Sequence, residues 1–164
     1  MTNEVERVEA ARRAYADLAP RVLEGAPWPL AEDYGTGPEA SWGPGEVLAH
    51  VAEMLPFWLG EMERVVDGAG PEPAPFGRIA DDPVRIGIIG RDRSLPLRVL
   101  LGRVDTGLRE WADRLTTLTD AERRRMGRHP RLGDMAAGEI LERFVIGHAE
   151  EHIGQLSEIL AAPG

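Results

Sequence analysis

The sequence predicts an all-α fold, a four-helix bundle in up-down-down-up order, and three observations support it. Apolar residues recur at three- and four-residue spacing in four long stretches, which is typical of amphipathic helices. Glycine- and proline-rich segments separate these stretches. The connector at 68–93 is long enough to cross between two parallel helices. A chain of 164 residues is expected to form a single domain, 1–164.

The helices are placed by their apolar positions and by the residues at their ends. The first spans about 3–24 and ends at Gly25. The second begins at Pro44, because proline suits the first turn of a helix, and its apolar stripe continues to Val65. The third spans about 97–118 and alternates steps of four and three: Leu97, Leu101, Val104, Leu108, Trp111, Leu115 and Leu118. The fourth is expected to run from a cap at Asp134 to about Ala161.

Two connectors have less regular patterns. In 68–93, a cluster of glycine and proline is followed by loose alternation over 84–89, which fits either one short strand or a buried loop. A short helical turn is expected at 119–122, because Thr119 and Glu122 form a capping pattern. The basic segment 123–131 follows and is interpreted as a turn before the last helix.

The histidines give the sense of the bundle. His148 and His152 lie one turn apart on the apolar row of the last helix, and His50 lies beside the stripe of the second helix. If these two helices were parallel, the histidines would differ in height by about 15 Å, whereas antiparallel helices at least halve that mismatch. An up-down-down-up order makes the two helices antiparallel and requires a long crossover, which 68–93 supplies.

Three neutral imidazoles form a suitable ligand set for a divalent metal, with zinc or nickel favoured and iron also compatible. His50, His148 and His152 are therefore the predicted metal ligands, and Glu151 is a candidate to support or complete the set. The competing interpretation is two half-exposed histidines on the last helix and a structural His50. The helical metalloprotease pattern requires glutamate directly after the first histidine, and Ala149 at that position excludes it.

Composition excludes several classes of function. The chain has no cysteine, so any thiol chemistry must use a small-molecule cosubstrate, and it has no lysine for a Schiff base. The net charge of −9 argues against binding along nucleic acid. No apolar run approaches the roughly 20 residues needed to cross a bilayer. Residues 1–7 lack the features of a signal peptide, so we expect a cytoplasmic protein.

Three motifs in this order resemble the DinB-like superfamily, and the resemblance extends over about residues 3–161. The first motif begins at Trp42 and ends at His50, eight residues later. The second is the segment 129–133 before the last helix, which starts at His129. The third is 148–155, with its two histidines and the following Gly-Gln.

The resemblance implies that the three histidines bind a metal in an up-down-down-up bundle, often a homodimer. It also implies an enzyme that transfers or isomerises groups with a low-molecular-weight thiol, whose thiolate the metal activates. The leading hypothesis is a thiol S-transferase that joins a small-molecule thiol to an electrophile. Arg124, Arg128 and Arg131 are possible contacts for an anionic cosubstrate, although a solvated turn is the simpler interpretation. No catalytic residue is assigned. The alternatives are a non-catalytic, stress-associated metal-binding bundle and a purely structural bundle.

Overall fold

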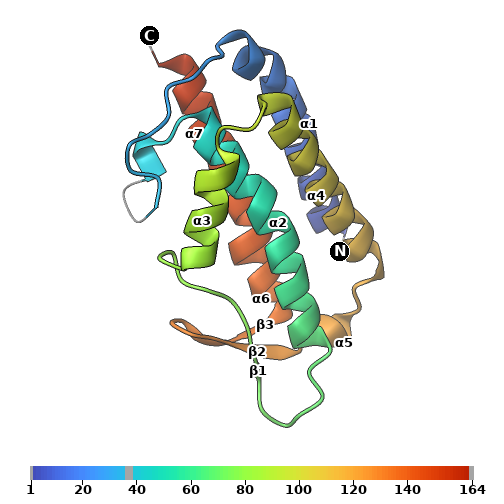
Figure 1. Cartoon of the computed structure of the whole chain (residues 1–164). Helices are drawn as coiled ribbons and strands as arrows, with labels where there is room; N and C mark the ends of the chain where they lie inside the picture. The colour runs from blue at the N-terminus through green and yellow to red at the C-terminus, as the bar shows by residue number, and fades with distance from the viewer. Residues whose placement is uncertain (1, 36–38, 163–164) are drawn as a thin grey trace.

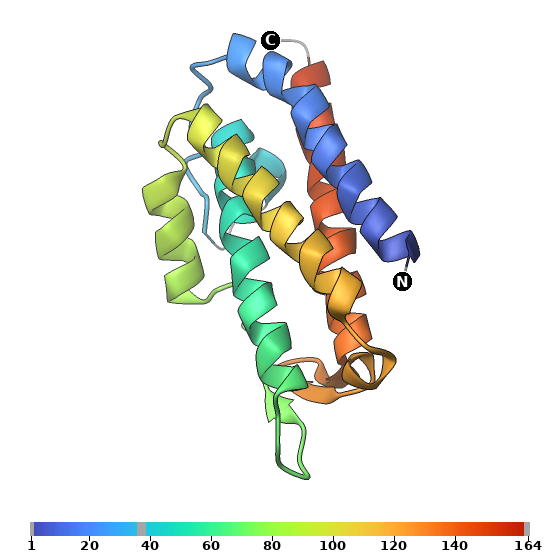
Figure 2. The ribbon, with the colours of Figure 1, turned by 90° about the vertical axis from the view of Figure 1, so that its right-hand side faces the viewer.

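The computed structural model describes residues 2–35 and 39–162, and its long helices lie side by side (Figures 1 and 2). The long helices are α1 (Thr2–Glu24), α2 (Pro44–Val66), α4 (Leu97–Thr117) and α7 (Gly147–Ala161). Both α1 and α2 pack against α4 and against α7. In Figure 1 the chain descends along α2 and ascends along α7, so these two helices are antiparallel.

The core lies between these helices and follows the predicted spacing. On α4 the fully buried positions include Val104, Leu108, Trp111 and Leu115, as the alternating steps predict. The Trp111 indole N–H also donates a hydrogen bond of 2.9 Å to the Leu55 carbonyl on α2. The described part of the chain contains no helix that is both long and apolar enough to cross a membrane.

The connector between α2 and α4 is more helical than expected. It contains α3 (Pro83–Asp92), which stands beside α2 at the outside of the molecule (Figure 2). Asp82 caps this helix, because its Oδ1 accepts hydrogen bonds from the backbone N–H groups of Val84 and Arg85. The interpretation of 84–89 as a strand or buried loop is therefore wrong, and the Asp82-Pro83 helix start was the signal against it.

A small sheet at one end of the helices corrects the all-α prediction (Figure 1). The middle strand is β2 (Met126–His129). It pairs in parallel with β1 (Ala74–Pro75) on one side and antiparallel with β3 (Gly133–Ala136) on the other. β2 follows the predicted short helix α5 (Asp120–Arg123), so the middle of the basic segment is a strand and not a turn. Asp134 lies in β3 opposite Arg128 and does not cap the last helix.

The last helix consists of three consecutive parts. It begins with α6 (Ala137–Ile140), continues as a π-helical segment over Leu141–Ile146, and then becomes α7. The Gly147 N–H donates to the Glu142 carbonyl, five residues back, which is the wide hydrogen bond of a π turn. This widened turn stands directly before His148, so it sets where the first histidine of α7 is placed.

Candidate metal centre

The structure brings together the three histidines that the sequence singled out. His50 Nε2 lies 3.0 Å from His148 Nε2, and His148 Nε2 lies 3.1 Å from His152 Nε2. His50 and His152 are buried, and His148 is partly exposed. In the described part of the chain, they form the one group of three or more metal-ligating side chains close enough to share an ion.

Each of the three rings is held at its other nitrogen by a side chain three residues further along the same helix. His50 Nδ1 lies 3.2 Å from Glu53 Oε1, and His148 Nδ1 lies 3.3 Å from Glu151 Oε2. The third ring follows the same rule with an amide, because His152 Nδ1 lies 2.8 Å from Oε1 of Gln155. Residues three apart are neighbours on a helix, so the repeated spacing explains the repeated contact.

These contacts determine which nitrogen carries the proton. An ionised carboxylate only accepts hydrogen bonds, so the Nδ1 atoms of His50 and His148 must donate. Gln155 donates its Nε2–H to the Glu39 carbonyl at 2.6 Å, which leaves its Oε1 as the acceptor for His152. Neutral rings protonated at Nδ1 present three Nε2 lone pairs to one another, and a cation between them satisfies all three.

The spacing of the nitrogens also fits a metal ion. Two nitrogen ligands about 2.1 Å from one ion lie about 3.0 Å apart at the right angle of an octahedral site and about 3.4 Å apart at the tetrahedral angle that zinc prefers. Burial lowers the pKa of His50 well below its usual value, and the nearby His152 and His148 lower it further. Burial, followed by His148, also lowers the pKa of His152. Neutral imidazole is the form that ligates a metal, so burial favours the ligating form of His50 and His152.

A hollow of about 160 Å³ opens beside His50 and His148. Its aromatic side is formed by Trp58 and Phe144, whose rings are stacked with centroids 4.4 Å apart. The ring of His129 also stacks on Phe144, with the ring centroids 5.4 Å apart. His129 therefore supports the wall of the hollow and is not a ligand.

The arginines of the hollow differ from the predicted ones. Among the described residues, its lining includes Arg78 and Arg85, and it does not include Arg124, Arg128 or Arg131. Arg128 instead pairs with Asp134 at 2.8 Å. The backbone N–H of Arg131 donates to His129 Nδ1, and Arg124 borders a separate hollow near residues 68–74. Sequence reasoning missed Arg78 and Arg85 because both lie in the connector, whose fold had no clear pattern.

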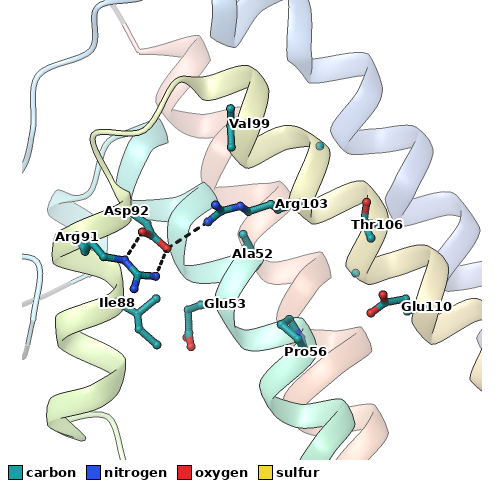
Figure 3. A pocket seen from close by; sticks show the side chains of 12 residues that line it. Ala52, Glu53, Pro56, Ile88, Arg91, Asp92, Val99, Arg103, Thr106 and Glu110 are labelled. Atoms are coloured by element: carbon teal, nitrogen blue, oxygen red, sulfur yellow. Dashed lines mark hydrogen bonds and ion pairs between the residues drawn. The ribbon is translucent and has the colours of Figure 1, made fainter.

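A larger groove of about 680 Å³ lies among α2, α3 and α4, and Figure 3 shows the side chains that line it. Asp92 is joined there to Arg91 and Arg103 by ion pairs. Glu53 borders this groove and also contacts His50, which lines the smaller hollow. The smaller hollow is the candidate site, because it is the one that holds the convergent ligands.

Two comparisons with known proteins bear on the chain. A family model described as the DinB superfamily matches residues 6–156, a range that contains all three histidines and both arginines of the hollow. No curated protein matches the chain significantly.

Proposed function

The chain belongs to the DinB superfamily, and from that premise we propose that it is a metal-dependent thiol S-transferase. His50, His148 and His152 hold a divalent ion, with zinc or nickel preferred to iron. The substrates are a low-molecular-weight thiol and an electrophile. The thiol sulfur bonds to the electrophilic carbon, the leaving group departs with its electron pair, and the thiol proton passes to solvent.

The convergence of three Nε2 atoms, each on a ring fixed at Nδ1, is the observation that supports this proposal. Three protein ligands leave positions open for a substrate, as in catalytic rather than structural metal sites. The ion supplies a positive charge that stabilises the thiol as its thiolate near neutral pH. Since the chain has no cysteine, the thiol must come from a second molecule.

The residues of the chain prepare the site for this reaction. Glu53, Glu151 and Gln155 keep the imidazoles in one tautomer and one orientation. Trp58 and Phe144 form an apolar surface beside His50 and His148, which limits the access of water to the reacting sulfur.

We also propose the finer architecture on which the site depends, an up-down-down-up four-helix bundle that associates as a homodimer. The antiparallel α2 and α7, and the long connector that contains α3, support the bundle order. Sedimentation velocity of the purified protein tests the dimer, and a monomer at micromolar concentration would contradict it.

Metal analysis tests the proposed site. The purified protein should hold about one divalent ion per chain, and His148→Ala should lose most of it. Glu158→Ala, at an exposed position on the same helix, is the matched control and should retain the ion. Substoichiometric metal that is unaffected by His148→Ala would refute the site.

A rate measurement separates the enzyme from a non-catalytic metal-binding bundle. The metal-loaded protein should consume a small thiol in the presence of a chloronitrobenzene faster than the metal-free protein does. Loss of the rate in His148→Ala would assign it to the ion. Equal rates with and without metal would favour the non-catalytic alternative.

A further inference from the structure

Two arginines with largely buried side chains flank the histidine cluster, and both come from the connector between α2 and α4. Arg78 follows β1, and Arg85 lies in the first turns of α3. Their side chains are 9% and 7% exposed, respectively, and both line the hollow that contains His50 and His148. Long charged side chains are rarely buried unless they have partners, so the contacts of these two need an explanation.

Arg85 is held in place by two acceptors. Its Nη1 donates to the Ala80 carbonyl at 2.9 Å, and its Nη2 donates to Glu39 Oε1 at 3.0 Å. A guanidinium has five N–H groups in a planar fork. Acceptors within the described part of the chain therefore occupy only a part of the donor capacity of Arg85, and the residue borders an open hollow.

Arg78 is held by a carboxylate and an aromatic ring. Its Nη2 lies 2.5 Å from Glu53 Oε1, and its guanidinium stacks on the Phe57 ring with its central carbon 3.9 Å from the ring centroid. The buried His129 donates its Nε2–H to the Arg78 carbonyl at 3.2 Å, which fixes the backbone beside the hollow. Both cations are thus held before a ligand arrives, which reduces the entropy cost of binding.

The charges of the loaded site do not balance without a further anion. Arg78 pairs with Glu53, and Arg85 pairs with Glu39, so these four residues are neutral together. Three neutral imidazoles and a divalent ion add two positive charges, of which a thiolate removes one. The Glu151 side chain is 75% exposed, so water screens its charge. An uncompensated positive charge in a largely buried site is costly.

We infer that the hollow binds a carboxylate-bearing reactant, with Arg85 as the main contact and Arg78 supporting it, beside the three histidines. Arginine binds carboxylates through two parallel hydrogen bonds, and burial strengthens such charge-assisted bonds. The stacked Trp58 and Phe144 provide an apolar surface for the rest of that reactant. The inference rests on the proposed function for the role of the reactant, and the binding of the carboxylate itself is testable without it.

The first experiment measures binding in the metal-free, full-length protein by titration calorimetry. The probe is benzoate, and benzamide is its neutral counterpart. Benzoate should bind the wild type about tenfold or more tightly than benzamide, and Arg85→Gln should abolish the preference. Arg103→Gln, which removes a half-exposed arginine of the separate groove, should retain it.

Two further variants keep the result interpretable if Arg85→Gln is poorly folded. Arg85→Lys keeps the positive charge but not the planar pair of N–H donors, so it should lose a part of the preference for benzoate over benzamide. Arg78→Gln should weaken benzoate binding less than Arg85→Gln does. Equal binding of benzoate and benzamide to the wild type would overturn the inference, as would a preference that persists in a folded Arg85→Gln protein. A preference that requires zinc and persists in Arg85→Gln would also overturn it, because the ion alone would then be the anion site.

A kinetic comparison identifies which reactant carries the carboxylate. The matched electrophiles are 4-chloro-3-nitrobenzoate and 4-chloro-3-nitrobenzamide. If the electrophile carries the carboxylate, Arg85→Gln should lower kcat/KM about tenfold for 4-chloro-3-nitrobenzoate and leave kcat/KM for 4-chloro-3-nitrobenzamide unchanged. If the thiol carries the carboxylate, Arg85→Gln should raise the KM of a carboxylate-bearing thiol with both electrophiles. Absence of any metal-dependent rate would refute the proposed function and leave the binding result standing.

Discussion

His50 and His148 are 98 positions apart in the sequence, yet their Nε2 atoms lie 3.0 Å apart. One ring is in the second turn of α2, and the other is in the first turn of α7. The antiparallel course of the two helices brings these positions to the same height. Tyr15 on α1 also anchors this level of α7, because its hydroxyl donates to the Ala149 carbonyl at 2.9 Å. The precision of the site therefore depends on helix packing as much as on the ligands.

The first prediction concerns Gln155, which holds the His152 ring. Gln155→Leu keeps a similar volume but removes the acceptor for Nδ1–H, so the ring loses its fixed orientation. Losses of this kind typically lower metal affinity by about 10–100-fold. Competition with a zinc chelator would measure the change. The matched control is Ser157→Ala, which removes only a local hydrogen bond to Ile153 and should leave the affinity within about twofold. A Gln155→Leu protein with wild-type affinity would contradict the assigned role.

The second prediction concerns Asp92, which joins α3 to α4 (Figure 3). Its carboxylate pairs with Arg91 at 2.6 Å and with Arg103 at 3.4 Å. Asp92→Asn should lower the free energy of unfolding at pH 7 by about 1–2 kcal/mol, a modest value because both arginines are at least half exposed. Urea unfolding would measure it. Asp113→Asn, at an exposed position on α4, should cost less than about 0.5 kcal/mol.

The same substitution has a predicted pH dependence. The hydrogen bond from Arg91 lowers the pKa of Asp92 below its usual value of 3.8. The contribution of Asp92 is therefore fully present above pH 3.8 and is lost as the pH falls through the lower pKa of the folded state. The difference between wild type and Asp92→Asn should disappear in that acidic range. A difference that persists there would show that charge is not the cause.

The third prediction concerns His129, which is buried under the aromatic wall. Burial lowers its pKa, and its Nδ1 already accepts from the N–H groups of Arg131 and Leu132. The unfolded chain therefore binds this proton more readily, and stability is lost as the pH falls from about 6.5 through the lower pKa of the folded state. His129→Asn should reduce the slope of unfolding free energy against pH by up to about 1.4 kcal/mol per unit.

Urea unfolding of the metal-free proteins between pH 7.5 and pH 5.5 would measure both slopes. The three histidines of the cluster are present in the wild type and in His129→Asn, so their contribution to the slope cancels in the comparison. Identical slopes in the two proteins would show that His129 takes up its proton equally well in the folded and unfolded states.

The long helices could be predicted because each buries a continuous stripe. On α4, residues such as Leu108 and Leu115 are fully buried, and their spacing alone identifies the helix. The small sheet could not be found in this way. The inward positions of β2 are Gly127 and His129, which do not form an apolar pattern, and its pairing partners come from distant segments. Its formation depends on the packing of the connector against the end of the long helices.

The candidate site likewise contains residues that the sequence could predict and residues that it could not. The step of four between His148 and His152 and the position of His50 were enough to predict the cluster, because helix geometry is regular. The acceptors three residues after each histidine are also visible in the sequence, although only Glu151 is a predicted site residue. Arg78 and Arg85 were not predictable, since their positions depend on β1 pairing and on the cap of α3.

The last prediction concerns the π turn before His148. A side chain at Gly147 would bring Cβ within 2.8 Å of the Glu142 carbonyl oxygen, a backbone atom that cannot move freely. Glycine to alanine in a helix normally stabilises by about 0.5–1 kcal/mol, because alanine has fewer unfolded conformations to lose. Gly154 on the same helix has open space where an added Cβ would lie, so Gly154→Ala should show that gain. Gly147→Ala should instead destabilise by about 1–3 kcal/mol and weaken zinc binding, because relief of the clash displaces His148. Thermal unfolding and chelator competition on both variants would measure these effects, and a stabilised Gly147→Ala protein with unchanged zinc affinity would show that the π turn does not position the ligand.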